Sequence, residues 1–338
     1  MELIIPDKLV RGDTVGVVSP SAGLCSIFPH RIEQAEENLR QLGLGVKYAK
    51  HAKENAGYVS ASARERADDI HEMFLDPEVK AVVASIGGNH SNQLLKYLDF
   101  DLIRNHPKIF MGYSDITVLH FALIAKAGLR TYYGPCILPE FGEYPEMLGY
   151  TSEYFSKALM SDEKLGRVPA SETWTEEFLD WSTKKDRTRA RIMSPNQGYE
   201  WWREGSAEGQ IFGGCIPSVN HLAGTDCWID FGGKIMFIDI PEGNADGKMD
   251  AAELDAYLAD LDNLGVFKSI AGLVIGRPYF YDDDDVARLK AMISYYVGPY
   301  RYPVLFNVNI GHTSPIMTVP LGAQVRIDSG LDLFEFGD

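Results

Sequence analysis

The sequence is poor in cysteine, in basic charge and in long hydrophobic runs, and each shortage excludes a class of protein. Its four cysteines form no C-x-x-C pair, so neither a disulfide framework nor a zinc site is indicated. No apolar stretch approaches the roughly 20 residues that span a bilayer. The N-terminus also lacks a basic region followed by an apolar run, so we expect no signal peptide and a soluble, cytoplasmic protein.

Basic side chains are outnumbered by acidic ones, 32 to 48, and the net charge is −16. Nucleic acids and anionic membranes need a basic face to bind, so both are disfavoured as partners. A small ligand needs only a few local groups and is compatible with this charge. The length of 338 residues favours two domains.

In the first half of the chain, apolar runs typical of buried strands alternate with helical periodicity. We expect strands at 15–19, 79–86 and 108–112, and helices at 29–44, 61–76, 91–98 and 117–127. Such alternation predicts a parallel sheet with helical crossovers. Chemistry gathers at the carboxyl ends of parallel strands, and Ser19, Gly87-Gly88 and Ser114 all follow such ends.

The second half repeats the alternation. We expect strands at 209–215, 234–240, 270–275 and 304–308, and helices at 251–264 and 286–297. The intervening stretch is rich in charge and tryptophan without clean periodicity, which favours a linker and active-site loop. The expected organisation is an N-terminal α/β domain at 1–160, this loop at 161–205 and a C-terminal α/β domain at 206–338.

Ser114 lies in Gly-Tyr-Ser-Asp, between an apolar strand and an apolar helix. A strand-to-helix elbow exposes a serine hydroxyl above the sheet, where a base can activate it as a nucleophile. The match to the G-x-S-x-G elbow is incomplete, because Ile116 replaces the second glycine. The alternative is that Ser114 only caps the following helix.

Two neighbouring features favour an oxyanion hole. The N–H of Asp115 starts a helix and would point at a developing oxyanion. The turn Gly87-Gly88-Asn89 follows a strand and offers backbone N–H groups, although it is equally compatible with a simple turn or a phosphate cradle. Neither a dinucleotide fingerprint nor a Walker loop is present.

His312 is the expected general base, because it sits in a glycine-flanked turn at the end of a buried strand. His120 and His221 fall in apolar helical patterns, where a core histidine with a hydrogen-bond partner is expected. His90 adjoins the Gly-Gly turn and is a further candidate.

Two carboxylates follow the strand Phe237-Ile-Asp-Ile-Pro-Glu242, and either Asp239 or Glu242 would orient a histidine by accepting its second N–H. The segment Glu242–Glu253 also matches part of the EF-hand pattern, at Asn244, Asp246, Gly247 and Glu253. An EF-hand needs a helix on both sides, whereas a strand is expected here, so a polar turn before the helix at 251 is favoured over calcium. No metal and no cofactor is expected.

Several short motifs together resemble the serine peptidase family of LD-carboxypeptidases and microcin C self-immunity peptidases. The resemblance covers nearly the whole chain. Its markers are Gly12-Asp-Thr-Val-Gly-Val-Val-Ser-Pro-Ser21, Ile86-Gly-Gly-Asn89, Gly112-Tyr-Ser-Asp115, Gly209-Gln-Ile-Phe-Gly-Gly214, Gly272-Leu-Val-Ile-Gly-Arg277 and Gly311-His-Thr-Ser-Pro315.

The resemblance implies a Rossmann-like N-terminal domain that holds the serine, a swivelling-type C-terminal domain that holds the acid and the histidine, and a homodimer. It implies that Ser114 is the nucleophile and His312 the base, with an oxyanion hole formed by the N–H groups of Gly88 and Asp115. The family's acid is a glutamate directly after an apolar strand. Here Asp239 occupies that place, and Glu242 remains the alternative acid.

The segment Trp174-Thr-Glu-Glu-Phe-Leu-Asp-Trp181 resembles the immunity-peptidase branch, in which a loop tryptophan stacks on the adenine of an aminoacyl-nucleotide. Trp181 is the expected equivalent. The expected activity is hydrolysis of a small peptide-like amide. The alternatives are removal of the terminal D-Ala from murein tetrapeptides and, in another class, a non-catalytic protein that binds a ligand or calcium.

Overall fold

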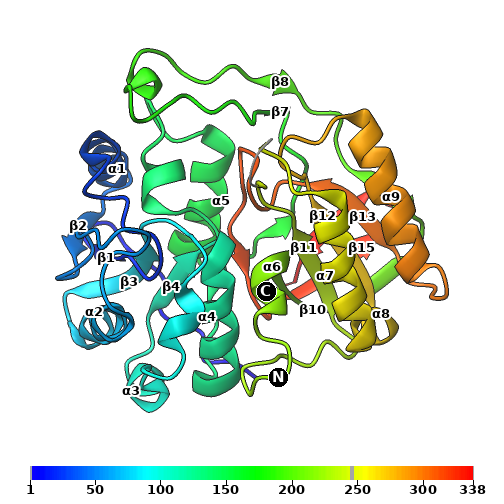
Figure 1. Ribbon diagram of the computed structural model, residues 1–338, viewed down its shortest axis with the longest axis horizontal. Helices are drawn as coiled ribbons and strands as arrows, with labels where there is room; N and C mark the ends of the chain where they lie inside the picture. The colour runs from blue at the N-terminus through cyan, green and yellow to red at the C-terminus, as the bar shows by residue number, and fades with distance from the viewer. Residues whose placement is uncertain (1, 244–246, 338) are drawn as a thin grey trace.

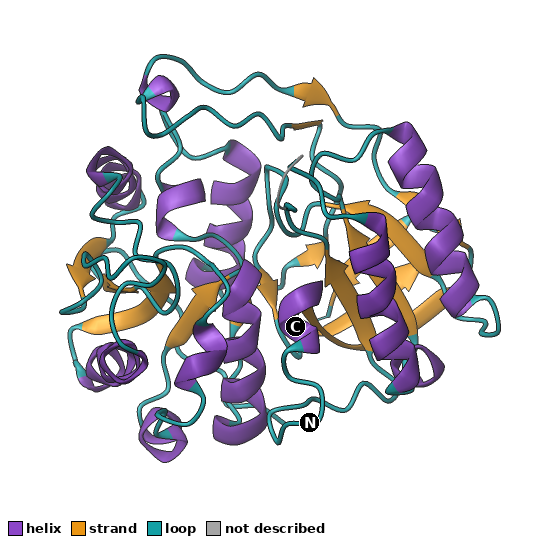
Figure 2. Cartoon of the chain, in the orientation of Figure 1, coloured by secondary structure: helices purple, strands orange, loops and turns teal. Residues whose placement is uncertain are grey.

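The computed structural model describes residues 2–243 and 247–337, and it contains two mixed α/β layers built on separate sheets (Figures 1 and 2). In Figure 1 the N-terminal part, in blue and cyan, lies on the left, and the C-terminal part, in yellow and red, lies on the right. The predicted fold class is confirmed: a parallel sheet in the N-terminal domain and a second α/β domain. None of the helices in the described ranges is long and apolar enough to cross a membrane.

The first sheet has six strands in the order β14-β5-β4-β3-β1-β2. Its five N-terminal strands are mutually parallel, and β14 adds antiparallel to β5. The strands are β1 (Thr14–Val18), β2 (Gly45–Tyr48), β3 (Val79–Ala84), β4 (Ile109–Gly112), β5 (Tyr132–Tyr133) and β14 (Val319–Pro320). The helices are α1 (Pro29–Gln41), α2 (Ala63–Leu75), α3 (Phe100–Asn105), α4 (Thr117–Ala122) and α5 (Gly149–Met160).

The second sheet has eight strands in the order β6-β16-β15-β10-β11-β12-β13-β9. Its centre is parallel and its flanks are antiparallel. The strands are β6 (Gly166–Arg167), β9 (Glu200–Arg203), β10 (Ser206–Cys215), β11 (Ile235–Asp239), β12 (Gly272–Gly276), β13 (Val304–Val308), β15 (Gln324–Asp328) and β16 (Leu333–Phe336). The helices are α6 (Ile216–Asn220), α7 (Ala251–Asn263), α8 (Val266–Ser269) and α9 (Asp283–Val297).

Local sequence explains where these elements begin. Ser62 caps α2 and forms a capping box with Glu65, which satisfies two backbone donors at the helix start. Strand β3 reads Val-Lys-Ala-Val-Val-Ala and is buried except for its lysine, as expected for a strand covered on both faces.

The two sheets share one continuous hydrophobic core. Aromatic contacts cross between them, with ring centroids 6.1 Å apart for Phe121 and Phe231 and 5.1 Å apart for Tyr133 and Phe237. The Thr117 hydroxyl also accepts a hydrogen bond from the N–H of Cys215 at 3.1 Å. This packing fixes the strand ends of one sheet against those of the other.

Two expected elements differ from the structure. The helix expected at 91–98 is only a 3₁₀ turn at Ser91–Leu94. Residues 161–205 contain short strands, including the paired β7 (Thr173–Trp174) and β8 (Ser194–Pro195), and these pass above both sheets in Figure 1. Each strand is too short to produce a periodic pattern.

Arg66, on α2, is 1% exposed. Its hydrogen bonds connect loops that lie at the strand ends of the first sheet. Its guanidinium donates to the carbonyls of Ala61, Pro20 and His90 and to the side chain of Gln93. Removing the charged partner of a buried hydrogen-bonding group destabilises the folded protein, because that group is left without a hydrogen bond.

We predict that Arg66→Leu lowers the free energy of unfolding by about 3 kcal/mol, because four acceptors lose their donor and two of them, the carbonyls of Ala61 and Pro20, are buried. Arg64→Leu on the same helix is the control, since Arg64 is exposed and only lies over the Tyr97 ring, and it should cost less than about 1 kcal/mol. Equilibrium urea unfolding measures both. Equal losses in the two variants would contradict the role given to Arg66.

Candidate active site

Ser114 occupies a sharp turn between β4 and a 3₁₀ turn at Ser114–Ile116, with a backbone φ of 63°. A non-glycine residue at positive φ costs on the order of 1–3 kcal/mol and is typical of nucleophile elbows. The capping alternative is not what the structure shows, because Tyr113 occupies the N-cap position and no side-chain cap bond is formed.

The Gly87-Gly88 turn packs directly against Ser114. A Cβ atom on Gly87 would lie 2.7 Å from the Ser114 Cβ and 2.9 Å from its Oγ, so only glycine fits there. The Asp115 carboxylate accepts the N–H groups of His90 and Ser91 at 2.9 and 2.8 Å, which fixes the turn beside the serine. Within the described residues, the N–H of Gly88 donates no hydrogen bond.

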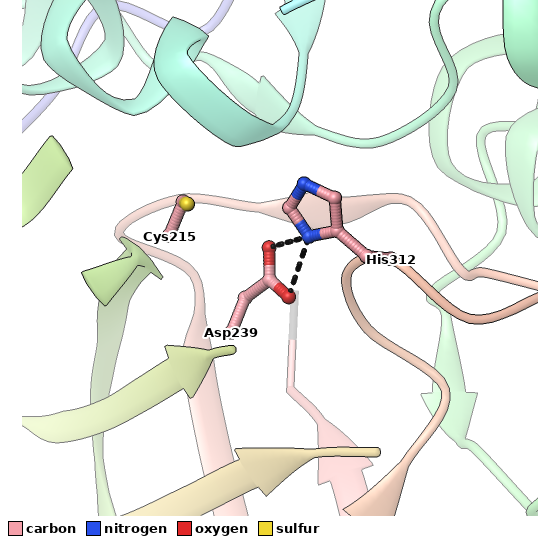
Figure 3. Close-up of side chains that lie close together, drawn as sticks. All are labelled: Cys215, Asp239 and His312. Carbon is pink, nitrogen blue, oxygen red and sulfur yellow. Dashed lines mark hydrogen bonds and ion pairs between the residues drawn. The ribbon is translucent and has the colours of Figure 1, made fainter. Parts of the chain in front are cut away.

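His312 and Asp239 form a close pair at the strand ends of the second sheet (Figure 3). The Nδ1 atom of His312 lies 2.9 Å from both carboxylate oxygens of Asp239, whose side chain is fully buried. Glu242 instead lies on the opposite side of the ring, with Oε2 3.6 Å from Nε2, and its side chain is 58% exposed. The two carboxylates therefore face different nitrogen atoms of one imidazole.

Tyr133 is a site residue that sequence reasoning missed. From β5, its hydroxyl donates to Asp239 and accepts the backbone N–H of Ser114 at 3.2 Å. One phenol therefore joins the backbone of Ser114 to the carboxylate that pairs with His312. Its strand has only two residues, and no motif marks it.

The electrostatic surroundings of His312 favour its protonated form. Burial lowers the pKa of the imidazole, but the charges of Asp239 and Glu242 outweigh burial and raise the pKa to about 9. Cys215, whose thiol lies beside this pair in Figure 3, has a pKa raised well above its usual range by burial, so it stays protonated near neutral pH.

Ser114, His312 and Trp181 line one cavity of about 500 Å³. The Trp181 ring packs edge-on against Phe28, with ring centroids 5.4 Å apart, and is tilted against Phe178, with centroids 5.7 Å apart. The Arg31 guanidinium lies 4.5 Å from the Trp181 ring centroid. Residues 176–191 supply much of the cavity wall.

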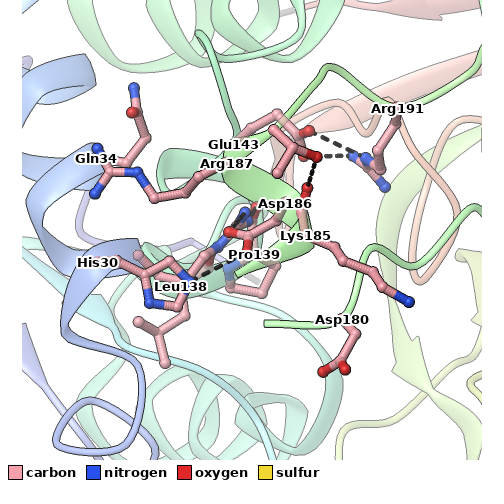
Figure 4. A network of polar contacts seen from close by, with 12 residues as sticks. His30, Gln34, Leu138, Pro139, Glu143, Asp180, Lys185, Asp186, Arg187 and Arg191 are labelled. Atoms are coloured by element: carbon pink, nitrogen blue, oxygen red, sulfur yellow. Dashed lines mark hydrogen bonds and ion pairs between the residues drawn. The ribbon is translucent and has the colours of Figure 1, made fainter. Parts of the chain in front are cut away.

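Buried ion pairs hold this loop in place (Figure 4). Asp186 accepts from His30 at 3.2 Å and from Arg31 at 3.1 Å, and both of these residues belong to α1. Arg191 pairs with Glu143 at 2.7 Å. The loop is thus anchored to the N-terminal layer at two points along its length.

The other candidate histidines and Ser19 lie outside the cavity. His120 is buried and its Nε2 lies 2.9 Å from the Gly112 carbonyl, as expected of a core histidine. The same expectation for His221 was wrong, because α6 ends at Asn220 and leaves His221 exposed. Ser19 is buried, with hydrogen bonds to Ala52 and Ser85.

The other three tryptophans between 174 and 202 pack or hydrogen-bond outside the cavity. Trp174 stacks under the Arg277 guanidinium, Trp202 stacks on Phe306 at 4.1 Å, and Trp201 donates to Asp332. Of the four tryptophans between 174 and 202, only Trp181 lines the cavity.

The EF-hand-like segment falls partly outside the described residues, because Asn244 and Asp246 lie in the gap at 244–246. The segment follows strand β11 rather than a helix, and Asp250 caps α7. Glu253 accepts a hydrogen bond from Tyr257.

Family models of the LD-carboxypeptidase N-terminal domain and C-terminal domain match residues 15–134 and 208–327. The chain belongs to the LD-carboxypeptidase family. It is therefore a serine peptidase-type hydrolase, which excludes the non-catalytic alternative.

Three relatives from this family match nearly end to end. YocD of Bacillus subtilis, named as a carboxypeptidase, is 36% identical over 95% of both chains. The microcin C7 self-immunity protein MccF of Escherichia coli is 30% identical over 96% of this chain and 93% of its own. A Bacillus subtilis protein named as a murein peptide carboxypeptidase is 33% identical over 96% of this chain and 91% of its own.

Solved structures of proteins similar to this chain have the same fold. MccF in complex with aspartyl sulfamoyl adenosine has a TM-score of 0.91 at 28% identity, covering 99% of this chain and 98% of that chain. An MccF-like protein from Bacillus anthracis has a TM-score of 0.88 at 36% identity, covering 98% of both.

We predict that the His312 imidazole titrates near pH 9, well above the ordinary value of about 6.5, because Asp239 and Glu242 favour its charged form. Glu242→Gln removes one of these charges and should lower that pKa by about 0.5. Carbon-edited NMR of the histidine rings measures both values. His120 is an internal control, since burial lowers its pKa to about 4. A His312 titration near 6.5 would contradict this assignment.

Proposed function

We propose that this chain hydrolyses a small peptide-like amide by acyl transfer, with Ser114 as nucleophile, His312 as general base and Asp239 as the acid of the triad. The observation that carries the proposal is the pairing of His312 with Asp239 beside a strained serine elbow in one cavity. The N–H groups of Gly88 and Asp115 form the oxyanion hole.

The proposed chemistry uses the two ring nitrogens of His312 differently. Asp239 accepts the Nδ1 proton, which leaves Nε2 unprotonated in the reactive form. Nε2 has no hydrogen-bond partner among the described residues, and the Ser114 hydroxyl turns towards it when substrate binds. Ser114 attacks the carbonyl carbon, Nε2 takes the hydroxyl proton and passes it to the leaving amine, and water releases the acyl group by the reverse path.

Asp239 is preferred to Glu242 as the triad acid because of their positions. Asp239 contacts Nδ1 and is held by Tyr133, whereas Glu242 lies 3.6 Å from Nε2, the atom that must face the serine. A buried carboxylate on Nδ1 fixes the tautomer, which an exposed carboxylate on the other side does not.

The proposed substrate is an aminoacyl- or peptidyl-nucleotide, with its base on the Trp181 ring. MccF, which shares this fold, has been solved with aspartyl sulfamoyl adenosine. In this chain Trp181 lines the same cavity as Ser114 and lies between Phe28 and Phe178, which suits an aromatic ring.

A second candidate substrate is a murein tetrapeptide that ends in D-Ala. The end-to-end similarity to a protein named as a murein peptide carboxypeptidase favours it. The same triad would release the terminal residue.

We also propose a cytoplasmic homodimer, with the nucleophile's domain at 1–160, the loop at 161–205 and the C-terminal domain at 206–338. The four cysteines are free and buried, which suits a reducing compartment.

We predict that Ser114→Ala lowers kcat at least about 10³-fold without unfolding the protein, because the alanine has no nucleophile. Hydrolysis of an aminoacyl sulfamoyl adenosine and of a murein tetrapeptide should be assayed side by side, with thermal unfolding as the control for the fold. Unchanged turnover in this variant would refute the proposed mechanism.

We predict that Asp239→Asn lowers kcat about 10⁴-fold, because an amide at this position stabilises the wrong imidazole tautomer. Glu242→Gln should change kcat less than about tenfold. Leucyl sulfamoyl adenosine is the suitable substrate, since its acyl side chain is uncharged. The reverse order of effects would make Glu242 the triad acid.

A further inference from the structure

Carboxylates dominate the charge of the cavity wall around the nucleophile. The charged residues that line the cavity, apart from His312, are two arginines and six acids: Arg31, Arg191, Glu140, Glu143, Glu176, Glu177, Asp186 and Glu242. These acids differ in how their charge is compensated, and the difference divides the cavity.

On the side of Trp181, each acid has an arginine. Asp186 pairs with Arg31 at 3.1 Å, and Glu143 pairs with Arg191 at 2.7 Å. Glu177 likewise pairs with Arg189 at 2.6 Å. We call this side, which also holds Phe28 and Phe178, the aromatic half.

Around His312, the acids lack such partners. Within the described residues, no lysine or arginine forms an ion pair with Glu140, Glu176 or Glu242, and the gap at 244–246 contains no basic residue. We call this side the acidic half. Arg191 and Arg277 favour the charged forms of Glu140 and Glu176 from beyond ion-pair distance.

Contacts tie the acidic half to the reacting groups. Glu242 lies 3.6 Å from the Nε2 atom of His312. The Tyr113 ring is 5.1 Å from the His312 ring, and its hydroxyl donates to Glu140 at 3.1 Å. Glu176 lines the same cavity, where its carboxylate accepts the N–H of Phe280 at 2.8 Å and its backbone carbonyl accepts from the Tyr279 hydroxyl at 3.4 Å.

Glu242 is the member of this set most available to a ligand. Burial raises the pKa of Glu140 to about 7, so this acid carries less than full charge near neutral pH, and burial also raises the pKa of Glu176. The Glu242 side chain is 58% exposed, and it reaches into the cavity without a cation beside it other than the His312 imidazolium.

We propose that the acidic half binds an ammonium group on the side chain of the substrate's acyl part and that Glu242 is the specificity-determining residue. The inference rests on the proposed function, in which the leaving group occupies the aromatic half and the acyl group extends towards the acidic half. A carboxylate side chain at this position would meet the like charge of Glu242, whereas an ammonium group would pair with it. MccF, by contrast, has been solved with aspartyl and glutamyl compounds.

The test compares lysyl, norleucyl and glutamyl sulfamoyl adenosine. The lysyl and norleucyl side chains have the same four-carbon chain and differ by the ammonium. The wild type should show a kcat/KM for the lysyl compound at least about tenfold above that for the norleucyl compound, with the glutamyl compound slowest. Glu242→Gln should bring the lysyl-to-norleucyl ratio close to one.

The ratio is the decisive quantity because kcat/KM refers to the free enzyme, so a change in the protonation of His312 that Glu242→Gln causes in the free enzyme affects all three substrates equally. The matched control is Glu177→Gln, which removes a paired acid of the aromatic half and should leave the ratio unchanged. A wild-type ratio near one, or a ratio that survives Glu242→Gln, would overturn the inference.

Binding to Ser114→Ala, measured by calorimetry with the same three compounds, separates the inference from the proposed function. Preferential binding of the lysyl compound without turnover by the wild type would support the ammonium site and refute the proposed reaction. Turnover without any preference in rate or binding would leave the reaction standing and overturn the ammonium site.

Discussion

The hydrogen bond from Tyr133 to Asp239 joins the strand ends of the two sheets, and the site depends on it. Tyr133 belongs to β5 of the first sheet and Asp239 ends β11 of the second. The same hydroxyl accepts the N–H of Ser114. A shift of one sheet against the other would therefore separate the turn at Ser114 from the carboxylate that pairs with His312. The shared hydrophobic core holds the two sheets in this register.

Charge is the second constraint on the site. The cavity gathers acids on a chain that already carries 16 excess negative charges. Their negative charge stabilises the imidazolium of His312, which is the form that a general base adopts after it takes a proton. The same charge raises the pH at which the imidazole is neutral and able to accept that proton. A cationic substrate group near Glu242 would oppose this field, and so would couple substrate binding to the protonation of His312.

Ser114, the Gly87-Gly88 turn, Asp239 and His312 could be predicted from the sequence, because each lies at or just after the carboxyl end of a parallel strand, where the chemistry of such sheets is usually located. Tyr133 could not be predicted, since a two-residue strand has no periodicity and its partner lies 106 residues away. The sequence also did not distinguish Asp239 from Glu242 as the partner of the His312 Nδ1 atom. Both follow β11, and only the structure shows Asp239 at Nδ1 and Glu242 near Nε2.

Covalent labelling tests the central claim most directly, because it reports the nucleophile without assuming a substrate. The native chain would be treated with a fluorophosphonate, digested and analysed by mass spectrometry, with Asp239→Asn labelled in parallel. We expect a single phosphonate adduct on Ser114 that forms far more slowly in Asp239→Asn. An adduct on another residue, or equal labelling rates in the two proteins, would contradict it.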